Sequence, residues 1–301
     1  MLSKGSKRRN KELAVELFFT FAAISTILLL FGIFAFLANV GIRAFAQIHM
    51  WDFLTGGVWN PDAYGTPSWG IFALIVSTLL ITSGALAIAI PLGLACAVYL
   101  SELAPSSIRE FIKPTIEMIA SIPSVVLGVL GLLILAPVVA FLFGIPNGLN
   151  ALSASILVAV LALPTIMSIS EDALSSVPLD YRAASYALGA TKWQTIRSVV
   201  VPVATPGIIA ASMLGMGTAI GETMVVLMVA GNTKAVPMSF LDPARTMTAN
   251  IAIEIKEVAV GSLHYEALFA IGLVLFLLTF LINFLVDIIM SRYEMREAGT
   301  A

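Results

Sequence analysis

Hydrophobic residues along the chain fall into six long stretches, which shorter, more polar segments separate. Each stretch exceeds the ~20 residues that a helix needs to cross the hydrocarbon core of a bilayer. The sequence therefore predicts an all-α integral membrane protein with six transmembrane helices. These predicted spans are residues 14–38, 69–100, 114–143, 151–173, 203–231 and 265–290.

The third predicted span contains two prolines, Pro123 and Pro137. Proline removes a backbone donor and clashes with the preceding helical turn, so we expect this span to be kinked or broken. Lipid tolerates such a break only where protein or a cavity satisfies the freed backbone groups.

Lysine and arginine predict the orientation of the chain. If the N-terminus is cytoplasmic, twelve of the 16 lie in segments on the inner side of the membrane. The four in outer segments are Arg43, Lys234, Arg245 and Lys256. Because positive charge marks cytoplasmic segments, both termini are predicted to be cytoplasmic. The basic tail 1–13 then precedes a retained first span, residues 39–68 form an outer loop, residues 69–290 form the core, and residues 291–301 form a second inner tail.

The composition is typical of a membrane protein, and the sequence lacks common metal-binding and nucleotide-binding patterns. The 301 residues are 59% hydrophobic and 11% charged. One cysteine, Cys96, excludes an intrachain disulfide, and the two histidines, His49 and His264, lack metal-ligand spacing. The chain also lacks the Gly-x-x-x-x-Gly-Lys-Ser/Thr loop that cradles nucleotide phosphates. We expect a non-catalytic chain without cofactor, metal or nucleic-acid partner, in contact with membrane lipid.

The segment 177–202 has the pattern of two short helices joined by a glycine turn. Asp180 is expected to cap the first helix, Gly189 to end it, and Thr191 to cap the second. Small residues such as Ala183 and Ala184 give the first helix a surface that permits close packing. The segment precedes the fifth span and is predicted to lie on the cytoplasmic side.

This segment resembles the Glu-Ala-Ala loop of the permease subunits of ABC importers. With Gly189 as anchor, Ala184 and Ser185 take the places of the two alanines, and Ala183 stands where glutamate is usual. The resemblance implies the type I importer fold, in which this loop couples the permease to two ATPase subunits. The residues that it assigns to coupling are Arg182, Ala183, Ala184, Ser185, Gly189, Ala190 and Thr191.

Two further stretches, "IASIPSVVLGVLGL" (119–132) and "AIGETMVVLMVAGN" (219–232), are similar to phosphate ABC transporter permeases of the PstC type. The resemblance covers nearly the whole chain. It implies ATP-driven import of inorganic phosphate across the inner (plasma) membrane. It also implies partnership with a homologous PstA-type permease, two ATPase subunits and an outer phosphate-binding protein.

The second stretch places Glu222 inside a predicted span, where a carboxylate is costly and usually functional. The family motif is commonly Arg-Ala-x-Gly-Glu-Thr, and Thr218 occupies the arginine position here. A like charge at 4 Å and an effective dielectric of about 20 costs ~4 kcal/mol, so an ionised, unpaired Glu222 does not bind phosphate directly. Three interpretations remain: an arginine of the partner permease pairs with it, it is protonated and acts as a donor or gate, or it bonds backbone or hydroxyl groups between helices.

Five residues are candidates for the substrate pathway: Glu222, Thr218, Thr223, Ser121 and Ser124. Thr218 and Glu222 would share one helix face. Ser121 and Ser124 flank the expected break at Pro123, where freed N–H groups and hydroxyls suit an anion. The alternative for the hydroxyl side chains is a local bond to the helix backbone.

Other functions stay open at this level. A permease for sulfate, molybdate or phosphonate fits the replacement of the family arginine by Thr218. A stand-alone secondary transporter or channel fits the spans but not the coupling loop. A role in reporting phosphate status to a signalling kinase is compatible with transport.

Overall fold

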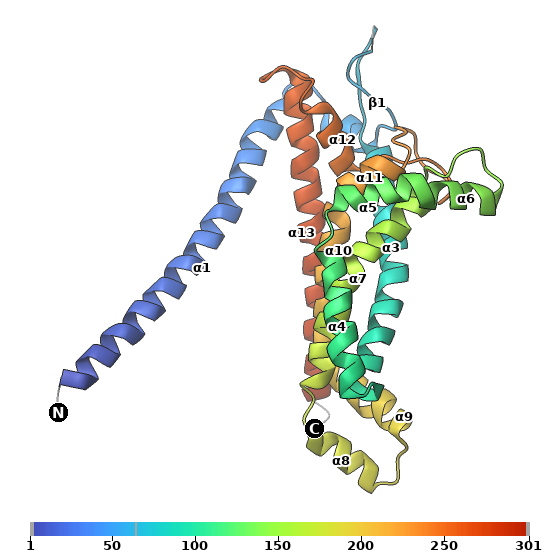
Figure 1. The fold of residues 1–301 in the computed structure, drawn as a ribbon. Helices are drawn as coiled ribbons and strands as arrows, with labels where there is room; N and C mark the ends of the chain where they lie inside the picture. Colours follow the sequence, from blue (N-terminus) through green and yellow to red (C-terminus); the bar gives the residue numbers. More distant parts are fainter. Residues whose placement is uncertain (1–2, 64, 299–301) are drawn as a thin grey trace.

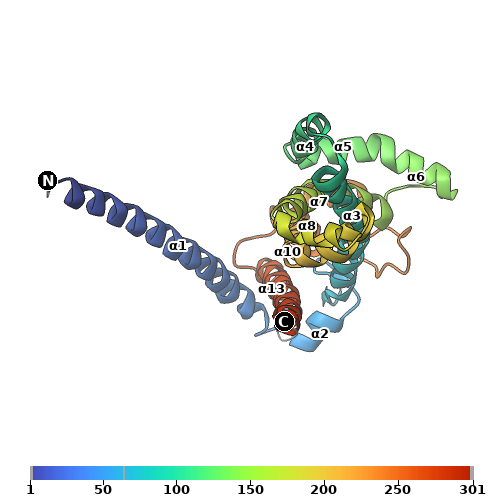
Figure 2. The same ribbon diagram turned by 90° about the horizontal axis from the view of Figure 1, so that it is seen from below.

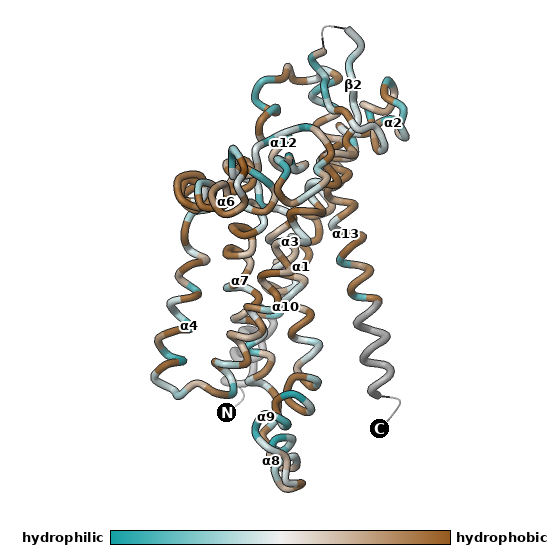
Figure 3. Tube along the Cα trace, turned by 90° about the vertical axis from the view of Figure 1, so that its right-hand side faces the viewer, coloured by the Kyte–Doolittle hydropathy of each residue, from teal (hydrophilic) through white to brown (hydrophobic). Residues whose placement is uncertain are grey.

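The computed structural model describes residues 3–63 and 65–298, and the side chains of residues 15–63 and 65–288. Six of its helical stretches are long and apolar enough to cross a membrane, as predicted. They are Val15–Ala44, Phe72–Leu103, Ser124–Phe143, Ala151–Ser175, Lys192–Gly221 and Leu263–Ile288. Figure 3 shows the apolar colouring of the long helices and the more polar colouring at the two ends of the molecule.

Three helices form the centre of the bundle: α3 (Phe72–Val98), α7 (Ala151–Ser175) and α10 (Val201–Gly221). Small residues allow the close approach that helix packing in membranes requires. A Cβ placed on Gly93 or Gly215 would lie within 3 Å of the Ile166 side chain. Gly93 and Gly215 therefore allow α3 and α10 to pack closely against α7.

Two long helices, α1 (Ser3–Ala44) and α13 (Leu263–Ala298), contact each other beside this bundle. Their backbones come close where Gly41 faces Ala270. A Cβ added to Gly41 would lie only 2.9 Å from the Ala270 Cα. Away from this contact α1 diverges from the bundle (Figures 1 and 2). None of the residues in its apolar window is buried, so most of its surface is free to face lipid.

The predicted third span is broken at Pro123, as expected, but its parts do not form one span. The helix α4 (Ser106–Ala120) runs along the bundle, whereas α5 (Ser124–Leu130), η2 (Gly131–Leu135) and α6 (Ala136–Phe143) run across its end (Figure 1). Pro123 has φ −55° and ψ 130°, an extended conformation that turns the chain. The expected break at Pro123 is therefore present, but the prediction that 114–143 forms a single span was wrong, because the parts before and after Pro123 run in different directions.

Pro137 does not break the helix. The π-helical turn η2 precedes it, and Pro137 occupies the first turn of α6. The wider π turn accommodates a residue without a backbone N–H, which explains why the chain continues through this proline.

The end of the bundle beside α5 and α6 also carries the segments that the sequence assigned to outer loops. They are α2 (Met50–Thr55), the antiparallel hairpin of β1 (Trp59–Asn60) and β2 (Ser68–Trp69), α11 (Met224–Val229) and α12 (Met247–Glu254). We call this the hairpin end (Figure 1). The stretch 251–254, which alternates apolar residues, belongs to α12 and is helical.

The opposite end carries α8 (Leu179–Ala187) and α9 (Lys192–Thr195), and we call it the α8 end. The first described residues of α1 and the last of α13 point toward this same side (Figure 1). The backbone of the predicted basic tail is helical from Ser3 onward, while residues 1–2 and 299–301 of the two predicted tails lie outside the described residues.

Candidate functional site

The coupling segment forms the predicted helix, glycine turn and second helix. Gly189 has φ +82°, a left-handed conformation that favours glycine and ends α8. The Thr191 side chain accepts a hydrogen bond from the Gln194 N–H at 3.4 Å, and the Gln194 side chain accepts from the Thr191 N–H at 2.8 Å. This reciprocal capping box fixes the start of α9.

The predicted cap by Asp180 was wrong. A cap at Asp180 would start the helix at Tyr181, but α8 begins two residues earlier, at Leu179, and its N-cap residue, Pro178, makes no side-chain cap. Pro178 has φ −58° and ψ 142°, so this restricted residue sets the entry into the helix.

The coupling segment exposes large apolar side chains at the α8 end of the molecule. We call these five residues the α8 patch: Leu179, Tyr181, Tyr186, Leu188 and Trp193. Leu188 is 90% exposed. Ala183, Ala184 and Gly189 are also exposed, whereas Ser185 and Ala190 are half-buried and the Ser185 hydroxyl bonds that of Thr195 at 2.9 Å. Apolar side chains grouped beyond the spans, next to a small-residue helix face, are typical of a protein interface.

Arg182 points toward the bundle. Its guanidinium pairs with Glu102 at 2.6 Å and donates to the carbonyl oxygens of Leu174, at 3.0 Å, and Val177. Glu102 belongs to the π turn η1 (Tyr99–Leu103) at the end of α3, and Leu174 lies in the last turn of α7. Arg182 therefore attaches α8 to two helices of the central bundle.

Glu222 lies directly after the end of α10, not within a helix. Its backbone is extended, with φ −66° and ψ 126°, and the next helix, α11, starts at Met224. One carboxylate oxygen accepts a hydrogen bond from the Val225 N–H at 3.1 Å, which caps α11. Among the residues whose side chains are described, no lysine or arginine forms an ion pair with Glu222. The predicted span 203–231 is therefore not one continuous helix, because α10 ends at Gly221 and α11 begins at Met224.

Three of the four hydroxyl candidates donate a hydrogen bond to the backbone of their own segment. Thr218 donates to the Leu214 carbonyl at 3.2 Å, Thr223 to that of Gly221 at 3.1 Å, and Ser121 to that of Met118 at 2.6 Å. Ser124 is the half-buried first residue of α5. The structure thus places all five pathway candidates at or beside two helix breaks, and α5 packs against α11 between them.

The face of α10 before Glu222 is open. Gly217 and Thr218 are exposed, and a Cβ added to Gly217 or Gly221 would meet no atom within 4 Å. Exposed glycines and a hydroxyl at the end of an apolar helix permit another helix or a ligand to approach the backbone closely.

Near the α8 end, α4 is held to α7 by charged groups. The Glu171 side chain is completely buried and pairs with Arg109 and with Lys113, the latter at 2.5 Å. Lys113 also pairs with Asp172 at 2.8 Å, and Glu117 accepts from the Ser168 hydroxyl at 2.8 Å. All of these contacts lie within the chain and hold α4 against α7.

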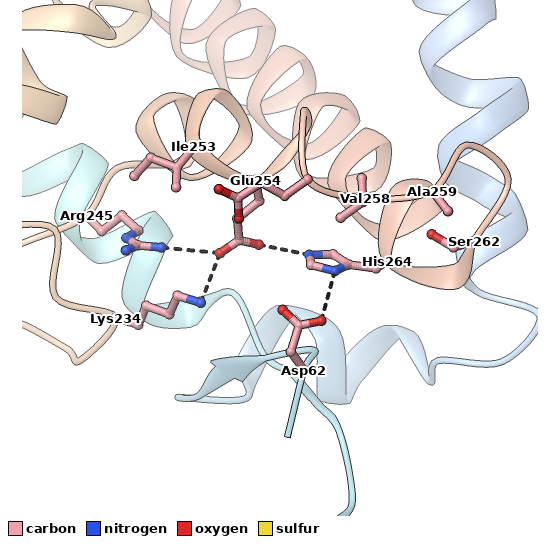
Figure 4. A pocket seen from close by; sticks show the side chains of 10 residues that line it. Asp62, Lys234, Arg245, Ile253, Glu254, Val258, Ala259, Ser262 and His264 are labelled. Carbon is pink, nitrogen blue, oxygen red and sulfur yellow. Dashed lines mark hydrogen bonds and ion pairs between the residues drawn. The ribbon is translucent and has the colours of Figure 1, made fainter. Parts of the chain in front are cut away.

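A second charged cluster, at the hairpin end, centres on the buried carboxylate of Glu254 (Figure 4). One of its oxygens is 2.9 Å from the Lys234 Nζ and 3.2 Å from the Arg245 Nη1. The other accepts from the Trp59 Nε1 at 2.8 Å and lies 2.9 Å from the His264 Nε2. We call these five residues the Glu254 cluster. Each carboxylate oxygen thus has two polar partners, which satisfies a group that burial would otherwise destabilise.

All residues of the Glu254 cluster except Trp59 line an open pocket of about 440 Å³. Figure 4 shows Asp62, from the hairpin, on the far side of His264, with its carboxylate 3.5 Å from the imidazole Nδ1. Glu257 lines the same pocket and is exposed. Because acidic and basic side chains both face the pocket, it does not select an anion by charge alone.

Burial raises the pKa of Glu254, but hydrogen bonds from Lys234, Trp59 and His264 outweigh it, so the pKa lies below the ordinary value of 4.5. Burial also lowers the pKa of Arg245 below its ordinary value, despite the nearby Glu254 charge. The ion pair is therefore formed at neutral pH. Its contribution to stability is present above the ordinary carboxyl pKa and is lost as pH falls through the lower, folded value.

Sequence reasoning missed the Glu254 cluster. It treated Lys234 and Arg245 only as orientation charges and His264 as a loop residue. The one sequence signal is a glutamate among the isoleucines of "NIAIEIKE", where a polar residue on an apolar helix face indicates a buried partner. The partners themselves come from distant segments, since Trp59 is 195 residues away from Glu254.

Comparison with protein families finds that residues 89–295 match the model of the "binding-protein-dependent transport system inner membrane component". The chain is 37% identical to a probable ABC transporter permease, YqgH of Bacillus subtilis, over 97% of the chain and 95% of the relative. It is 35% identical to the phosphate transport system permease PstC of Mesorhizobium japonicum, over 92% and 89% of the two chains. For PstC of Haemophilus influenzae the identity is 32%, over 93% and 94%.

Solved structures show the same fold. A chain of the methionine ABC transporter MetNI superposes with a TM-score of 0.58 at 22% identity, covering 74% of this chain and 97% of that chain. The chain is a member of the binding-protein-dependent transport system inner membrane component family, the non-catalytic, multi-pass inner-membrane permease subunits of ABC importers.

Proposed function

We propose that this chain is one of two homologous permease subunits of an ATP-driven importer of inorganic phosphate. The observation that carries the proposal is similarity to named phosphate permeases along about nine-tenths of the chain. The segment "AIGETMVVLMVAGN", which resembles phosphate permeases, supports the proposal. It forms the end of α10, the break at Glu222 and α11.

The second permease, of the PstA type, is proposed to pack on the open face of α10. Gly217, Thr218 and Gly221 are exposed on that face in the part of the chain that the structure describes. An arginine from the second permease would reach Glu222 there and supply the charge that Thr218 does not. Paired in this way, Glu222 would orient the arginine toward a phosphate anion without repelling it. Thr218, Thr223, Ser121 and Ser124 would contribute hydroxyl or backbone groups beside the two breaks.

Two ATPase subunits are proposed to serve the pair of permeases, one on each coupling segment. The α8 patch provides the apolar contact, and the small residues Ala183 and Ala184 permit close approach. Arg182 would act through its attachment to Glu102, Leu174 and Val177, so that a push on α8 moves α3 and α7. The α8 end is then cytoplasmic, as are both termini, and the positive charge of the inner segments supports this orientation.

The outer phosphate-binding protein is proposed to dock at the hairpin end. This end carries the polar hairpin and α12 and lies opposite the coupling segment (Figure 3). Transport would alternate access to a site between the two permeases, with lipid around α1.

A purified complex of this chain with its second permease and ATPase subunits tests the substrate. We expect phosphate-loaded binding protein to raise the ATPase rate at least tenfold over the rate with unloaded protein, because a coupled importer hydrolyses ATP when substrate is delivered. The same assay with sulfate, molybdate and phosphonate is the control. Stimulation by one of these anions and not by phosphate would show that the replacement of the family arginine by Thr218 accompanies a different substrate.

A further inference from the structure

Two routes connect the Glu254 cluster to the elements that flank the break at Glu222: one ends on α11, and the other ends on the backbone of Glu222. The first route passes through Arg245, whose Nε donates to the Asn232 carbonyl at 2.9 Å. The Asn232 side-chain amide in turn donates to the Leu227 carbonyl in α11 at 2.6 Å. Asn232 has φ +54°, a left-handed conformation that is uncommon outside glycine and that its local bonds hold in place. Arg245 thereby fixes the end of α11.

The second route passes along α12. Glu254 is the last residue of this eight-residue helix, and Thr248 lies in its first turn. The Thr248 hydroxyl donates to the backbone carbonyl of Glu222 at 3.1 Å. The start of the helix is fixed as well, since the Thr246 side chain caps it and the Met247 N–H donates to the Thr78 hydroxyl of α3 at 3.1 Å. One end of α12 therefore contacts Glu222 and the other end carries the carboxylate of the cluster.

The charge of Glu254 holds the ends of both routes together. Its carboxylate is the shared partner of Lys234, just after α11, and Arg245, just before α12. It also accepts from Trp59 of the hairpin and contacts His264 of α13. A neutral amide at this position would leave two buried or half-buried cations without their counter-ion. The segments that carry them would then separate more readily.

We propose that Glu254 is a positioning residue for transport: its carboxylate ties the hairpin, α11, α12 and α13 together and so sets the backbone break at Glu222. The inference rests on the proposed function in placing Glu222 on the substrate path. Glu254 does not contact the substrate in this arrangement. It acts through Arg245 and α12 on the geometry of Glu222, the residue proposed to orient an arginine of the second permease.

The first test measures uptake of radiolabelled phosphate by the reconstituted complex with Glu254→Gln. We expect the maximal rate per assembled complex to fall at least tenfold, while the half-saturating phosphate concentration stays within twofold of wild type. Glu257→Gln is the matched control, because Glu257 lines the same pocket and its side chain has no polar partner in the described part of the chain. An unchanged maximal rate in Glu254→Gln would overturn the proposal.

The second test does not depend on the substrate. Val226 is a buried residue of α11, 1% exposed, and can be replaced by cysteine in a chain whose single native cysteine, Cys96, is alanine. We expect Glu254→Gln to raise the rate of labelling by a membrane-impermeant maleimide at least tenfold, because a loosened α11 opens locally more often. Glu257→Gln should leave the rate within twofold. Equal labelling rates with and without Glu254→Gln would overturn the proposal.

The two tests separate this inference from the phosphate assignment. If the wild-type complex takes up no phosphate but the labelling contrast appears, Glu254 positions α11 and only the substrate proposal fails. If Glu254→Gln does not assemble, Arg245→Lys replaces it. Lysine keeps the positive charge beside Glu254 but has a single amine, which cannot reproduce the guanidinium bonds to both Asn232 and Glu254. The same rise in labelling is expected, and its absence would contradict the proposal.

Discussion

Replacing Leu188 by glutamate is expected to abolish recovery of the ATPase subunits with this chain. Leu188 is 90% exposed at the tip of the coupling segment, next to the glycine turn. Burying a leucine in a partner's groove contributes ~1.5–3 kcal/mol, and an unpaired carboxylate in its place adds a further desolvation cost. Loss of ~3 kcal/mol or more lowers affinity over 100-fold. The measurement is the molar ratio of ATPase to permease after affinity purification in detergent.

The matched control is Met238→Glu. Met238 is also 90% exposed but lies between α11 and α12, at the hairpin end. We expect it to retain the wild-type ratio of ATPase to permease. Since Leu188 has almost no contact with its own chain, Leu188→Glu should not alter the folding of the bundle. Normal recovery of the ATPase with Leu188→Glu would mean that the α8 patch is not the docking surface.

Replacing Glu222 by glutamine is expected to reduce phosphate uptake at least tenfold without loss of assembly. The amide oxygen of glutamine can still accept the Val225 N–H, so the cap on α11 is retained. Only the charge is lost, and with it the proposed pairing to an arginine of the second permease. The measurement is initial uptake per assembled complex.

Alanine at the same position separates the charge from the cap. Glu222→Ala removes both, so it should show the same loss of uptake and also a lower thermal stability of the purified complex, by about 1 kcal/mol for a lost capping bond. Wild-type uptake by Glu222→Gln together with impaired uptake by Glu222→Ala would contradict the pairing. It would favour the interpretation in which Glu222 serves only the backbone.

The sequence predicted those features that depend on neighbouring residues. Long apolar stretches predicted the spans, because length and hydropathy are local properties. The turn at Gly189 and the cap at Thr191 also follow from local chemistry, as does the break at Pro123. The direction of the chain after Pro123 is not local. It depends on α5 packing against α11, a hundred residues later in the sequence.

The two errors at the candidate site have the same origin. Glu222 was placed on a helix because "GMGTAIGETMVVLMV" lies inside one long, mostly apolar stretch, and no proline marks the end of α10. The break is maintained by the carboxylate cap on Val225 and by the hydroxyl of Thr248, which is 26 residues away. The Glu254 cluster joins four segments that only the folded chain brings together. Hydrophobic periodicity and motif spacing do not predict such contacts between distant segments.

The central claim is that this chain forms half of a phosphate pathway powered by ATP. The most direct test is ATP-dependent uptake of radiolabelled phosphate into sealed vesicles of known orientation. The vesicles contain this chain, its second permease, the ATPase and the binding protein. We predict uptake that requires ATP and that unlabelled phosphate suppresses, while sulfate and molybdate do not. Phosphate uptake that persists without ATP, or ATP-dependent uptake of another oxyanion in its place, would contradict the account.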